Sequence, residues 1–397
     1  MKITDLKWTP VFVPIEAPLR YSQGAHPGFS RIIVQLETDE GITGLGECYG
    51  GKAREGQLGE FRASLRGEDP FQLERIRWKL GSPGALKLFG HVLPLAAVEF
   101  ACLDIQGKAL GRPISDLLGG RIRDRIPFCA YLFYRYPNEK GEGEVSNAAQ
   151  MVEFARALTA QYGFQTMKYK CGVLPPDEEI ATVIALREAF PHHKIRMDPN
   201  AVWSVSTALY VAKKLRDSDL EYLEDPTWGL RGMARVNQKA PWVTLASNMS
   251  VFSIEDLPPA ALLEVLDVVL LDPHWYGGIT RARLAGQICE VFNLDIGMHS
   301  GAELGVSLAA MLHLGAVLPN LAVALDSHYH HLCDDVIQGG KLKYENGAIA
   351  VPAGPGLGVK LDPDKVAKYH ELAKTQAMGS WIEDPRSPGA ITCYPKF

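Results

Sequence analysis

The sequence lacks the cysteine pattern of a disulfide-stabilised protein. Its seven cysteines are odd in number and contain no CxxC pair, which is typical of reduced thiols in a reducing compartment. Cys171 lies beside Lys170 and is a candidate nucleophile by position. No Ser/His/Asp or Cys/His motif frames it, however, and small buried cysteines are common, so we expect a structural role for it.

Long apolar runs and blocks of like charge are also missing. No uninterrupted apolar run approaches a membrane span, and residues 1–5 show no apolar core of signal-peptide length. The net charge of -5 is small and mixed along the chain, which argues against nucleic acid and anionic membrane as partners. We expect a cytoplasmic protein that binds a small molecule and forms a homo-oligomer of a size that the sequence leaves open.

The chain holds 397 residues, of which 47% are hydrophobic and 22% charged. This is enough for two domains or for one barrel with an attached module. The first part, residues 1–122, predicts strands and then helices, and therefore a compact α+β module. Within it, residues 19–29 predict a loop with Gly and Pro that carries Arg20 and His26, and a lid and a plain connection are equally good interpretations.

Residues 123–330 repeat a unit of one short apolar strand and one amphipathic helix. This pattern, without a GxGxxG or P-loop motif, indicates an α/β fold of the (β/α)8 barrel type rather than a nucleotide-binding sheet. The last part, residues 331–397, predicts a strand and one helix that return to cover the first module. The barrel strands are expected at residues 126–132, 165–170, 194–198, 221–224, 243–248, 268–272, 294–299 and 321–326.

Polar residues stand at the carboxyl ends of successive predicted strands, which is where (β/α)8 barrels have their active sites. Helix capping explains one or two such residues but not an unbroken series, and Lys and His are poor N-caps. The series is Lys168 with Lys170, Asp198, Glu224, Asn248, Asp272, His299 and Asp326.

Lys168 and Lys170 are two residues apart in a strand-like run, so their side chains share one face. Two ammonium groups at that spacing repel by about 2 kcal/mol at an effective dielectric near 20, which pushes one of them toward neutrality. A catalytic base also needs partial burial or a nearby dication. Taken alone, the pair also fits a solvated surface strand.

Asp198, Glu224 and Asn248 end three neighbouring strands, so their oxygens can converge. Three hard oxygen ligands suit Mg²⁺ and disfavour zinc. Each residue by itself also fits a helix cap or a salt-bridge partner. Together and in register, they predict a metal site.

Asp272 and His299 end the next two strands. A carboxylate bound to one imidazole nitrogen fixes the tautomer and raises the basicity of the other, which makes His299 a second acid or base. The lysine pair and this dyad flank the predicted metal site. The arrangement predicts abstraction of a proton next to a carboxylate, whose enediolate forms only when a preorganised cation takes up the second negative charge.

These residues resemble the enolase superfamily, and within it the glucarate dehydratase group related to mandelate racemase and muconate lactonizing enzyme. Asn248 as the third ligand is a mark of that group. The resemblance spans nearly the whole chain. It is most specific in the runs Lys168-Tyr169-Lys170-Cys171-Gly172, Met197-Asp198-Pro199-Asn200, Glu224-Asp225-Pro226, Leu271-Asp272-Pro273-His274-Trp275 and Met298-His299-Ser300.

The resemblance implies a modified TIM barrel, (β/α)7β, in residues 123–330, and an N-terminal α+β capping domain that the C-terminal segment completes. It implies Lys170 as base with Lys168 lowering its pKa and contacting the carboxylate, Mg²⁺ held by the three oxygen ligands, and Asp272 with His299 as the dyad. The implied substrate contacts are His26, Tyr131, Asn200, Asp326 and His328. Arg20 of the predicted loop is a further candidate.

The sequence departs from the group at two places. Gly301-Ala302 stands where the group has a pair of asparagines, and the segment after Pro226 is shorter. Both places flank the distal end of the substrate. The resemblance therefore implies a Mg²⁺-dependent sugar acid dehydratase that makes a 2-keto-3-deoxy acid, with the substrate's length and stereochemistry left open. A racemase or epimerase with the same bases, and a non-catalytic paralogue, are the alternatives.

Overall fold

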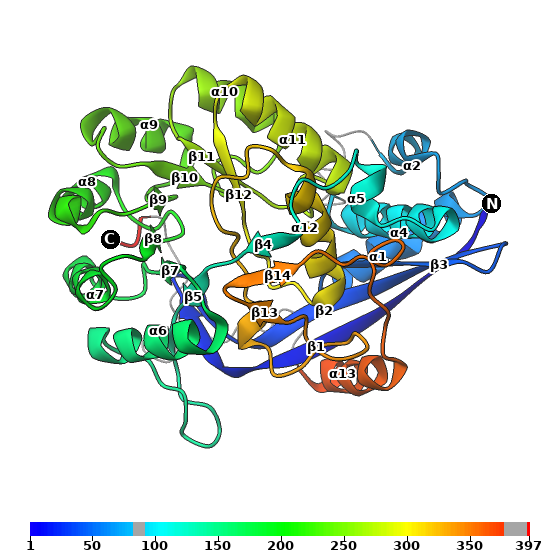
Figure 1. Cartoon of the computed structure of the whole chain (residues 1–397), viewed down its shortest axis with the longest axis horizontal. Helices are drawn as coiled ribbons and strands as arrows, with labels where there is room; N and C mark the ends of the chain where they lie inside the picture. The colour runs from blue at the N-terminus through cyan, green and yellow to red at the C-terminus, as the bar shows by residue number, and fades with distance from the viewer. Residues whose placement is uncertain (82–91, 377–394) are drawn as a thin grey trace.

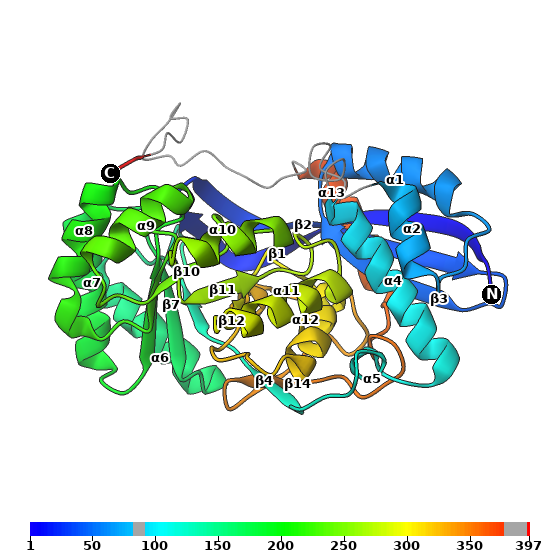
Figure 2. The same cartoon turned by 90° about the horizontal axis from the view of Figure 1, so that it is seen from above.

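The computed structural model describes residues 1–81, 92–376 and 395–397. The fold is α/β and has two adjoining parts (Figure 1). An antiparallel sheet with its helices forms the capping part, and a curled parallel sheet surrounded by helices forms the barrel part. Viewed from above, the two parts lie next to each other and the long strands of the capping sheet extend over the barrel (Figure 2).

The capping sheet has the strand order β3-β2-β1-β6. The expected loop at residues 19–29 is wrong, because the two flanking strands continue through most of it and pair from Leu19 with His26 to Tyr21 with Gly24. A register shift between Pro14 and Leu19 interrupts the pairing. The strands are β1 Ile3–Tyr21, β2 Gly24–Thr38, β3 Thr43–Tyr49 and β6 Tyr134–Arg135.

Helix α4, Val92–Leu110, packs its apolar surface on the capping sheet. The approach is close because β3 presents glycines to it. A Cβ on Gly44 would lie 2.0 Å from the Ala101 carbonyl oxygen, and one on Gly46 would lie 2.0 Å from the Ala97 carbonyl oxygen. The other helices of this part are α1 Lys52–Leu65, α2 Leu73–Leu80 and the short α5 Ile114–Leu117.

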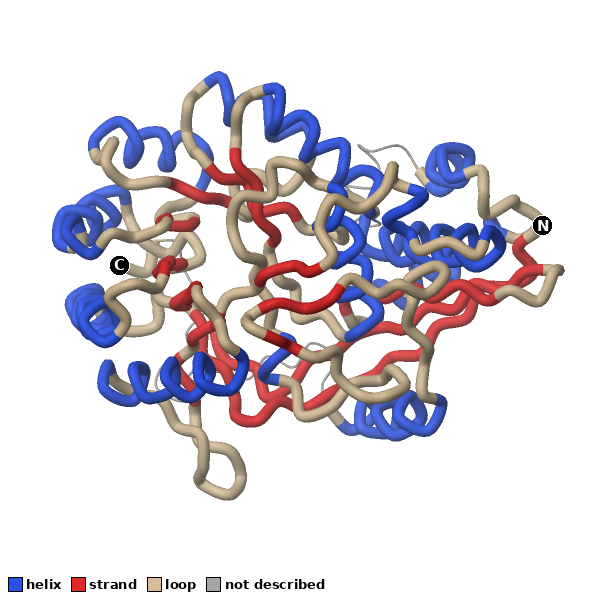
Figure 3. Tube along the Cα trace, in the orientation of Figure 1, coloured by secondary structure: helices blue, strands red, loops and turns tan. Residues whose placement is uncertain are grey.

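The parallel sheet has seven strands in the order β12-β11-β10-β9-β8-β7-β5, and helices surround it (Figure 3). The repeated strand and helix units therefore predicted the fold class correctly. The strands are β5 Ala130–Leu132, β7 Thr166–Lys170, β8 Lys194–Asp198, β9 Tyr222–Glu224, β10 Leu245–Ser247, β11 Val268–Leu271 and β12 Asp295–Met298. The helices are α6 Ala148–Tyr162, α7 Pro176–Ala189, α8 Val205–Lys214, α9 Gly229–Lys239, α10 Leu257–Leu262, α11 Ile279–Val291 and α12 Gly305–Val317.

Two of the expected barrel strands differ from the prediction. Residues 126–132 divide into β4, Arg125–Pro127, and β5, because β4 leaves the barrel and pairs with β14. Residues 321–326 form only isolated parallel bridges, in which Leu321 meets Ile296 and Leu325 meets Phe128. We call this segment the seam, because its backbone bonds reach both edges of the parallel sheet: the Ala322 amide donates to Ile296 of β12 at 3.1 Å, and the amide of Cys129, which directly precedes β5, donates to Leu325 at 2.9 Å.

Side chains fill the interior of the barrel. A buried cluster of Tyr222, Ala246, Val268, Leu270 and Val323 occupies it, and the guanidinium of Arg196 lies 4.7 Å from the centre of the Tyr222 ring. The barrel is therefore a packed core, and only its carboxyl-terminal mouth is available for a ligand.

The C-terminal segment contacts both parts. Helix α13, Pro363–Thr375, packs on β1, and the His370 ring bonds the Pro10 carbonyl at 2.7 Å. The hairpin of β13, Tyr344–Glu345, and β14, Ala348–Ala350, pairs with β4. The end from Trp381 lies outside the described residues as far as residue 394. None of the described helices has the length and apolarity that crossing a bilayer requires.

Candidate active site

Strand register places Lys170 and Asp198 side by side at the mouth of the barrel. Lys170 on β7 pairs with Asp198 on β8, and its ammonium group donates to Asp198 and, at 3.2 Å, to the Tyr131 hydroxyl. Lys168 lies 3.2 Å from the same Asp198 carboxylate. Both lysines therefore face the same side of β7, as their alternation predicts.

Lys168 lies deeper than Lys170 and contacts three carboxylates. Besides Asp198, its ammonium group lies 2.5 Å from Glu224 and donates to Asp326 at 2.5 Å. Burial acts to lower the pKa of Lys168, but Asp326 and Glu224 outweigh it and raise that pKa well above its ordinary value. This direction is opposite to the one that repulsion between the two lysines predicts, because the carboxylates stabilise the charged form.

The expected metal ligands contain oxygens that no protein group satisfies. Glu224 Oε1 and the side-chain oxygen of Asn248 are buried without a partner, whereas Glu224 Oε2 lies 2.5 Å from the ammonium group of Lys168. Buried polar atoms without partners are costly and rare. No three His, Cys, Asp or Glu side chains gather as a metal site in the described part of the chain, but this donor set contains an amide, and hard oxygens of this kind fit Mg²⁺.

The two carboxylates of this set shift in opposite directions. Burial, reinforced by the charge of Asp198, raises the pKa of Glu224 well above its ordinary value. At Asp198 burial also acts to raise the pKa, but Lys170 and Lys168 lower it below the ordinary range. A divalent cation between the two groups would compensate both charges.

Asp225 and Asn200 hold the ligand loops in shape. The Asp225 carboxylate accepts hydrogen bonds from the amides of Asn248 at 2.8 Å and Met249 at 2.9 Å. The backbone amide of Asn200 donates to the Asp198 carboxylate at 2.9 Å, and the side-chain nitrogen of Asn200 lies 3.5 Å from the Met249 sulfur. Asn200 and Asp225 both have positive φ, 53° and 34°, which marks strained loop backbone at a site.

Asp272 and His299 form the expected pair at the ends of β11 and β12. The Nδ1 atom of His299 lies 3.0 Å from Asp272 Oδ2. The amide of His274 donates to the other oxygen at 2.8 Å, and its Nδ1 atom lies 3.0 Å from that oxygen. Burial acts to raise the pKa of Asp272, but His274 and His299 lower it below its ordinary range. Asp272 is therefore an ionised acceptor.

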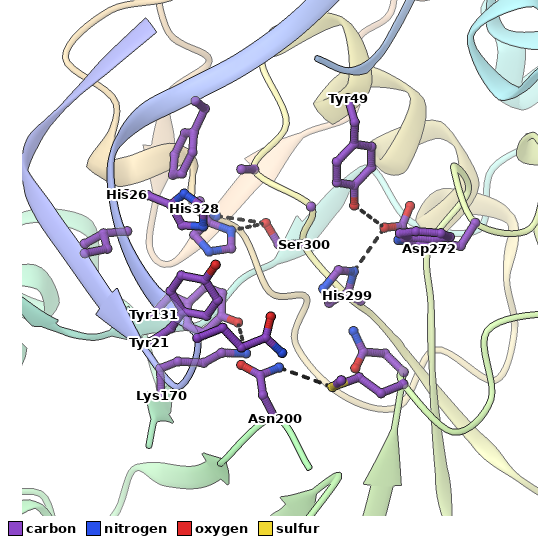
Figure 4. Close-up of a pocket in the computed structure, with 18 of the residues that line it drawn as sticks. Tyr21, His26, Tyr49, Tyr131, Lys170, Asn200, Asp272, His299, Ser300 and His328 are labelled. Atoms are coloured by element: carbon purple, nitrogen blue, oxygen red, sulfur yellow. Dashed lines mark hydrogen bonds and ion pairs between the residues drawn. The ribbon is translucent and has the colours of Figure 1, made fainter. Parts of the chain in front are cut away.

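A cavity of about 590 Å³ lies between the barrel mouth and the capping sheet. Lys170 and Asn200 line one side of it, and Asp272 and His299 line the other (Figure 4). Asn248 also lines the cavity. The capping and flanking side chains that complete the wall include Tyr21, His26, Phe29, Tyr49, Tyr131 and His328.

Four of the expected substrate contacts, His26, Tyr131, Asn200 and His328, line this cavity. His26 stacks on Tyr21 with a ring separation of 4.7 Å, and Tyr131 lies beside His328 at 4.7 Å. Burial lowers the pKa of His328 well below its ordinary value, and Lys170 lowers it further. His328 is therefore neutral, and its Nδ1 atom lies 2.7 Å from the Ser300 hydroxyl.

Two expected substrate contacts lie elsewhere. The Arg20 guanidinium is buried 4.7 Å from the centre of the Tyr136 ring, and Arg20 is not among the residues that line the cavity. Asp326 is buried in the barrel, where it accepts a hydrogen bond from Lys168 and lies 3.4 Å from Arg196. The structure thus brings Asp326 to the lysine and not to the cavity wall.

The sequence reasoning assigned no role to several residues of the site. Asp225 directly follows Glu224, and His274 stands two residues after Asp272. This closeness to predicted site residues is the sequence signal that could have found them. Tyr49 and Glu179 carry no local signal. Tyr49 reaches Asp272 from the capping sheet, and Glu179 reaches back from α7 to accept bonds from the amides of residues 172–174.

Two family models match the chain. Residues 3–119 match the mandelate racemase / muconate lactonizing enzyme N-terminal domain. Residues 150–365 match the enolase C-terminal domain-like family, which alone covers more than half of the chain.

Curated relatives and solved structures agree with these matches. A probable glucarate dehydratase from Streptomyces coelicolor is 40% identical over 97% of this chain and 93% of its own. The crystal structure of an enolase from Mycobacterium smegmatis with tartrate has a TM-score of 0.92 and 40% identity, and covers 100% of this chain and 98% of its own. An enolase from Thermobispora bispora with magnesium and formate has the same TM-score and identity and covers both chains fully. The chain therefore belongs to the enolase superfamily.

Proposed function

We propose that the protein is a Mg²⁺-dependent dehydratase of a sugar acid, an aldarate or an aldonate, and that its product is a 2-keto-3-deoxy acid. One observation carries this proposal. Lys170 and His299 line the same cavity from β7 and β12, and the strands between them supply oxygens without protein partners. The 40% identity to a probable glucarate dehydratase supports the same reaction class.

Asp198, Glu224 and Asn248 would hold the Mg²⁺. When bound there, the cation would supply the positive charge that a carboxylate needs while the neighbouring carbon loses its proton. The relatives crystallised with magnesium support this choice of metal. Tartrate in the relative from Mycobacterium smegmatis supports a small hydroxy acid as substrate class.

Lys170 and His299 would move the protons. One of them takes the proton on the carbon next to the carboxylate. His299 gives a proton to the β-hydroxyl when that group leaves as water, and the enol that remains becomes the keto acid. Asp272 holds His299 by its Nδ1 atom, so the Nε2 atom is the one available for transfer. Tyr131, Asn200, His26 and His328 would contact the substrate from the cavity wall.

The test is a screen of aldonic and aldaric acids with Mg²⁺, in which keto acids are detected with semicarbazide. We expect at least one acid to give product, and we expect Lys170→Ala and His299→Asn to lose turnover while they remain folded by circular dichroism. Lys194→Ala and His192→Asn are matched controls, because these residues lie at the opposite end of the barrel unit and on the surface. Failure of every hydroxy acid to react with Mg²⁺ present would contradict the proposal.

A racemase or epimerase of a hydroxy acid is the second candidate. Two proton carriers in one cavity serve a 1,1-proton transfer as well, and the N-succinyl-L-Arg/Lys racemase from Bacillus cereus is 26% identical over 92% of the chain. Exchange of the α-proton with deuterated solvent without formation of keto acid would select this candidate. Tight Mg²⁺ binding without exchange for any acid would indicate a non-catalytic paralogue.

A further inference from the structure

Tyr49 is a capping-sheet residue that reaches the barrel's acid/base pair. It ends β3, lines the cavity, and donates its hydroxyl to Asp272 Oδ2 at 3.1 Å (Figure 4). This is the same oxygen that receives His299 Nδ1 at 3.0 Å. Tyr49 therefore acts on the atom that orients the imidazole of His299.

The direction of this hydrogen bond is fixed by charge. Burial, and next the charge of Asp272, raise the pKa of Tyr49 well above its ordinary value, so the hydroxyl keeps its proton. Asp272 is ionised and can only accept. His274 contacts the other oxygen, Asp272 Oδ1, through its backbone amide and its ring. Tyr49 and His299 are the residues that contact Oδ2.

Neighbouring residues hold the Tyr49 ring in place. The Arg31 guanidinium lies 4.5 Å from the ring centre, its Nε bonds Glu47 at 2.7 Å, and it donates to the Gly301 carbonyl at 2.9 Å. A Cβ on residue 301 would lie 1.7 Å from the Tyr49 hydroxyl oxygen and 2.3 Å from the ring carbon that bears it. Glycine at 301 therefore leaves the space that the hydroxyl occupies.

We propose that Tyr49 is a positioning residue for the Asp272 and His299 pair, and that Gly301 is the residue that admits it. The proposal rests on the proposed function and adds that the His299 half of the chemistry depends on the capping sheet, whereas the Lys170 half does not. Lys170 donates its hydrogen bonds to Tyr131 and Asp198, which are both barrel residues.

The first test is substrate-free and uses Tyr49→Phe. NMR follows the titration of the His299 ring, which is assigned by its absence in His299→Asn. Loss of one donor leaves more charge on Asp272 for the imidazolium, so we expect the midpoint of His299 to rise by about half a pH unit or more. Tyr49→Phe keeps the other ionisable side chains of the cavity that carry nitrogen, Lys170, His26 and His328. A shift of the His299 midpoint therefore comes from the lost hydroxyl.

A matched control is Tyr210→Phe. The Tyr210 hydroxyl also donates to a carboxylate, that of Asp177 at 2.6 Å, but on the exposed surface. This control should leave the His299 midpoint unchanged. An unchanged midpoint in Tyr49→Phe, or an equal shift in both variants, overturns the inference even if no substrate is ever found.

The second test is α-proton exchange in deuterated solvent with two acids epimeric at C2. Lys170→Ala and His299→Asn identify which residue handles which epimer. In Tyr49→Phe we expect the exchange that depends on His299 to fall by about tenfold or more, because a misoriented imidazole loses part of its acid/base contribution, and the other exchange to stay within about twofold. Equal losses for both epimers overturn the inference.

Gly301→Ala tests the second part of the proposal. Its methyl displaces the Tyr49 hydroxyl, so we expect the same selective loss, and in the double variant no loss beyond the larger single one. Additive losses would show that Gly301 acts apart from Tyr49. If the wild type exchanges neither epimer, the proposed function fails, while the NMR titration still decides the role of Tyr49.

Discussion

At the scale of single residues, Lys168 is surrounded by the carboxylates of Asp198, Glu224 and Asp326, all of them buried. Replacing it by methionine removes the ammonium and leaves those charges uncompensated. We expect Lys168→Met to lower the free energy of unfolding by about 3–5 kcal/mol in EDTA, measured with urea. Added Mg²⁺ should stabilise this variant more than the wild type, because two of the carboxylates are the proposed metal ligands.

Lys374→Met is the control for this prediction. Its partner is Glu371, and both side chains are more than half exposed, so the change should stay within about 0.5 kcal/mol. A Mg²⁺ effect equal in Lys168→Met and the wild type would contradict the prediction.

Residue reasoning from the sequence was correct where strand alternation decides the outcome. It predicted that Lys168 and Lys170 share a face, and both contact Asp198. It did not predict that the pKa of Lys168 is raised, because Glu224 and Asp326 reach that lysine from segments distant in the sequence. Alternation predicts which way a side chain points but not which charges meet it.

At the scale of elements, the loop between β7 and α7 depends on one buried carboxylate. Glu179 in the first turn of α7 accepts bonds from the amides of Gly172 at 2.9 Å, Val173 at 2.8 Å and Leu174 at 3.0 Å. Burial raises the pKa of Glu179 to about 7, and the amides limit that rise. The carboxylate thus shapes the segment that directly follows Lys170.

This raised pKa predicts how stability depends on pH. Between about pH 4.5 and 7 the folded protein keeps a proton on Glu179 that the unfolded chain has released, so the contribution of this group to stability is largest at low pH and falls as pH rises toward 7. The fall is on the order of 3 kcal/mol. In Glu179→Gln the change in unfolding free energy between pH 5 and pH 8 should be smaller than in the wild type. The same change in both proteins would contradict the prediction.

Two carboxylates of the capping part accept hydrogen bonds from the N-termini of helices in the barrel part. Glu47 accepts bonds from the amides of Leu304 and Ser307 at the start of α12. Glu99 accepts them from Ile279 at 2.6 Å and Thr280 at 3.0 Å at the start of α11. These contacts satisfy helix N-termini with negative charge, and they join the two parts.

The contact of Glu99 gives a prediction for stability. Its carboxylate also pairs with Arg77 at 2.7 Å, and both side chains are largely buried. Glu99→Ala should therefore cost about 3 kcal/mol in the free energy of unfolding, since it removes a cap and leaves the largely buried Arg77 with only the exposed Glu74 as a charged partner. Glu371→Ala, which breaks an exposed pair, should cost about 0.5 kcal/mol or less by the same urea titration. Equal costs would contradict this explanation.

The sequence predicted the larger elements well because their period and end signals are local. The sequence predicts helices over residues 93–110 and 362–375; α4 ends at the expected residue, and α13 begins and ends within one residue of the prediction. It could not predict that β1 and β2 continue through residues 19–29, because the pairing of the two strands decides that outcome. Nor could it separate β4 from β5, since the partner of β4 lies about 220 residues further along.

At the scale of the whole molecule, the capping and barrel parts share one buried hydrophobic cluster. Val11, Phe29 and Phe100 from the capping part belong to the same cluster as Met167 and Met298 from the barrel. We expect a single unfolding transition in urea, in which amides of α4 and β8 lose protection at the same denaturant concentration. Hydrogen exchange with mass spectrometry measures both, and two well-separated transitions would contradict the prediction.

The fold class and the site share one physical basis at this scale. Repeated strand and helix units predicted a parallel barrel, and a parallel barrel gathers strand ends at one mouth, so the predicted Lys, metal and dyad residues meet there. Tyr49 could not be predicted, because its position depends on how the capping sheet docks.

The seam at residues 321–326 makes the wall of the barrel unequal around its circumference. Between β7 and β8 a continuous ladder of paired residues holds the wall, whereas at the seam only isolated bridges do. We therefore expect local opening of the barrel to occur first at the seam, so that its amides exchange with solvent sooner than those of β8. His328 stands two residues after the seam and lines the cavity. We therefore expect this side of the cavity to adapt to ligands of different width with the least loss of packing.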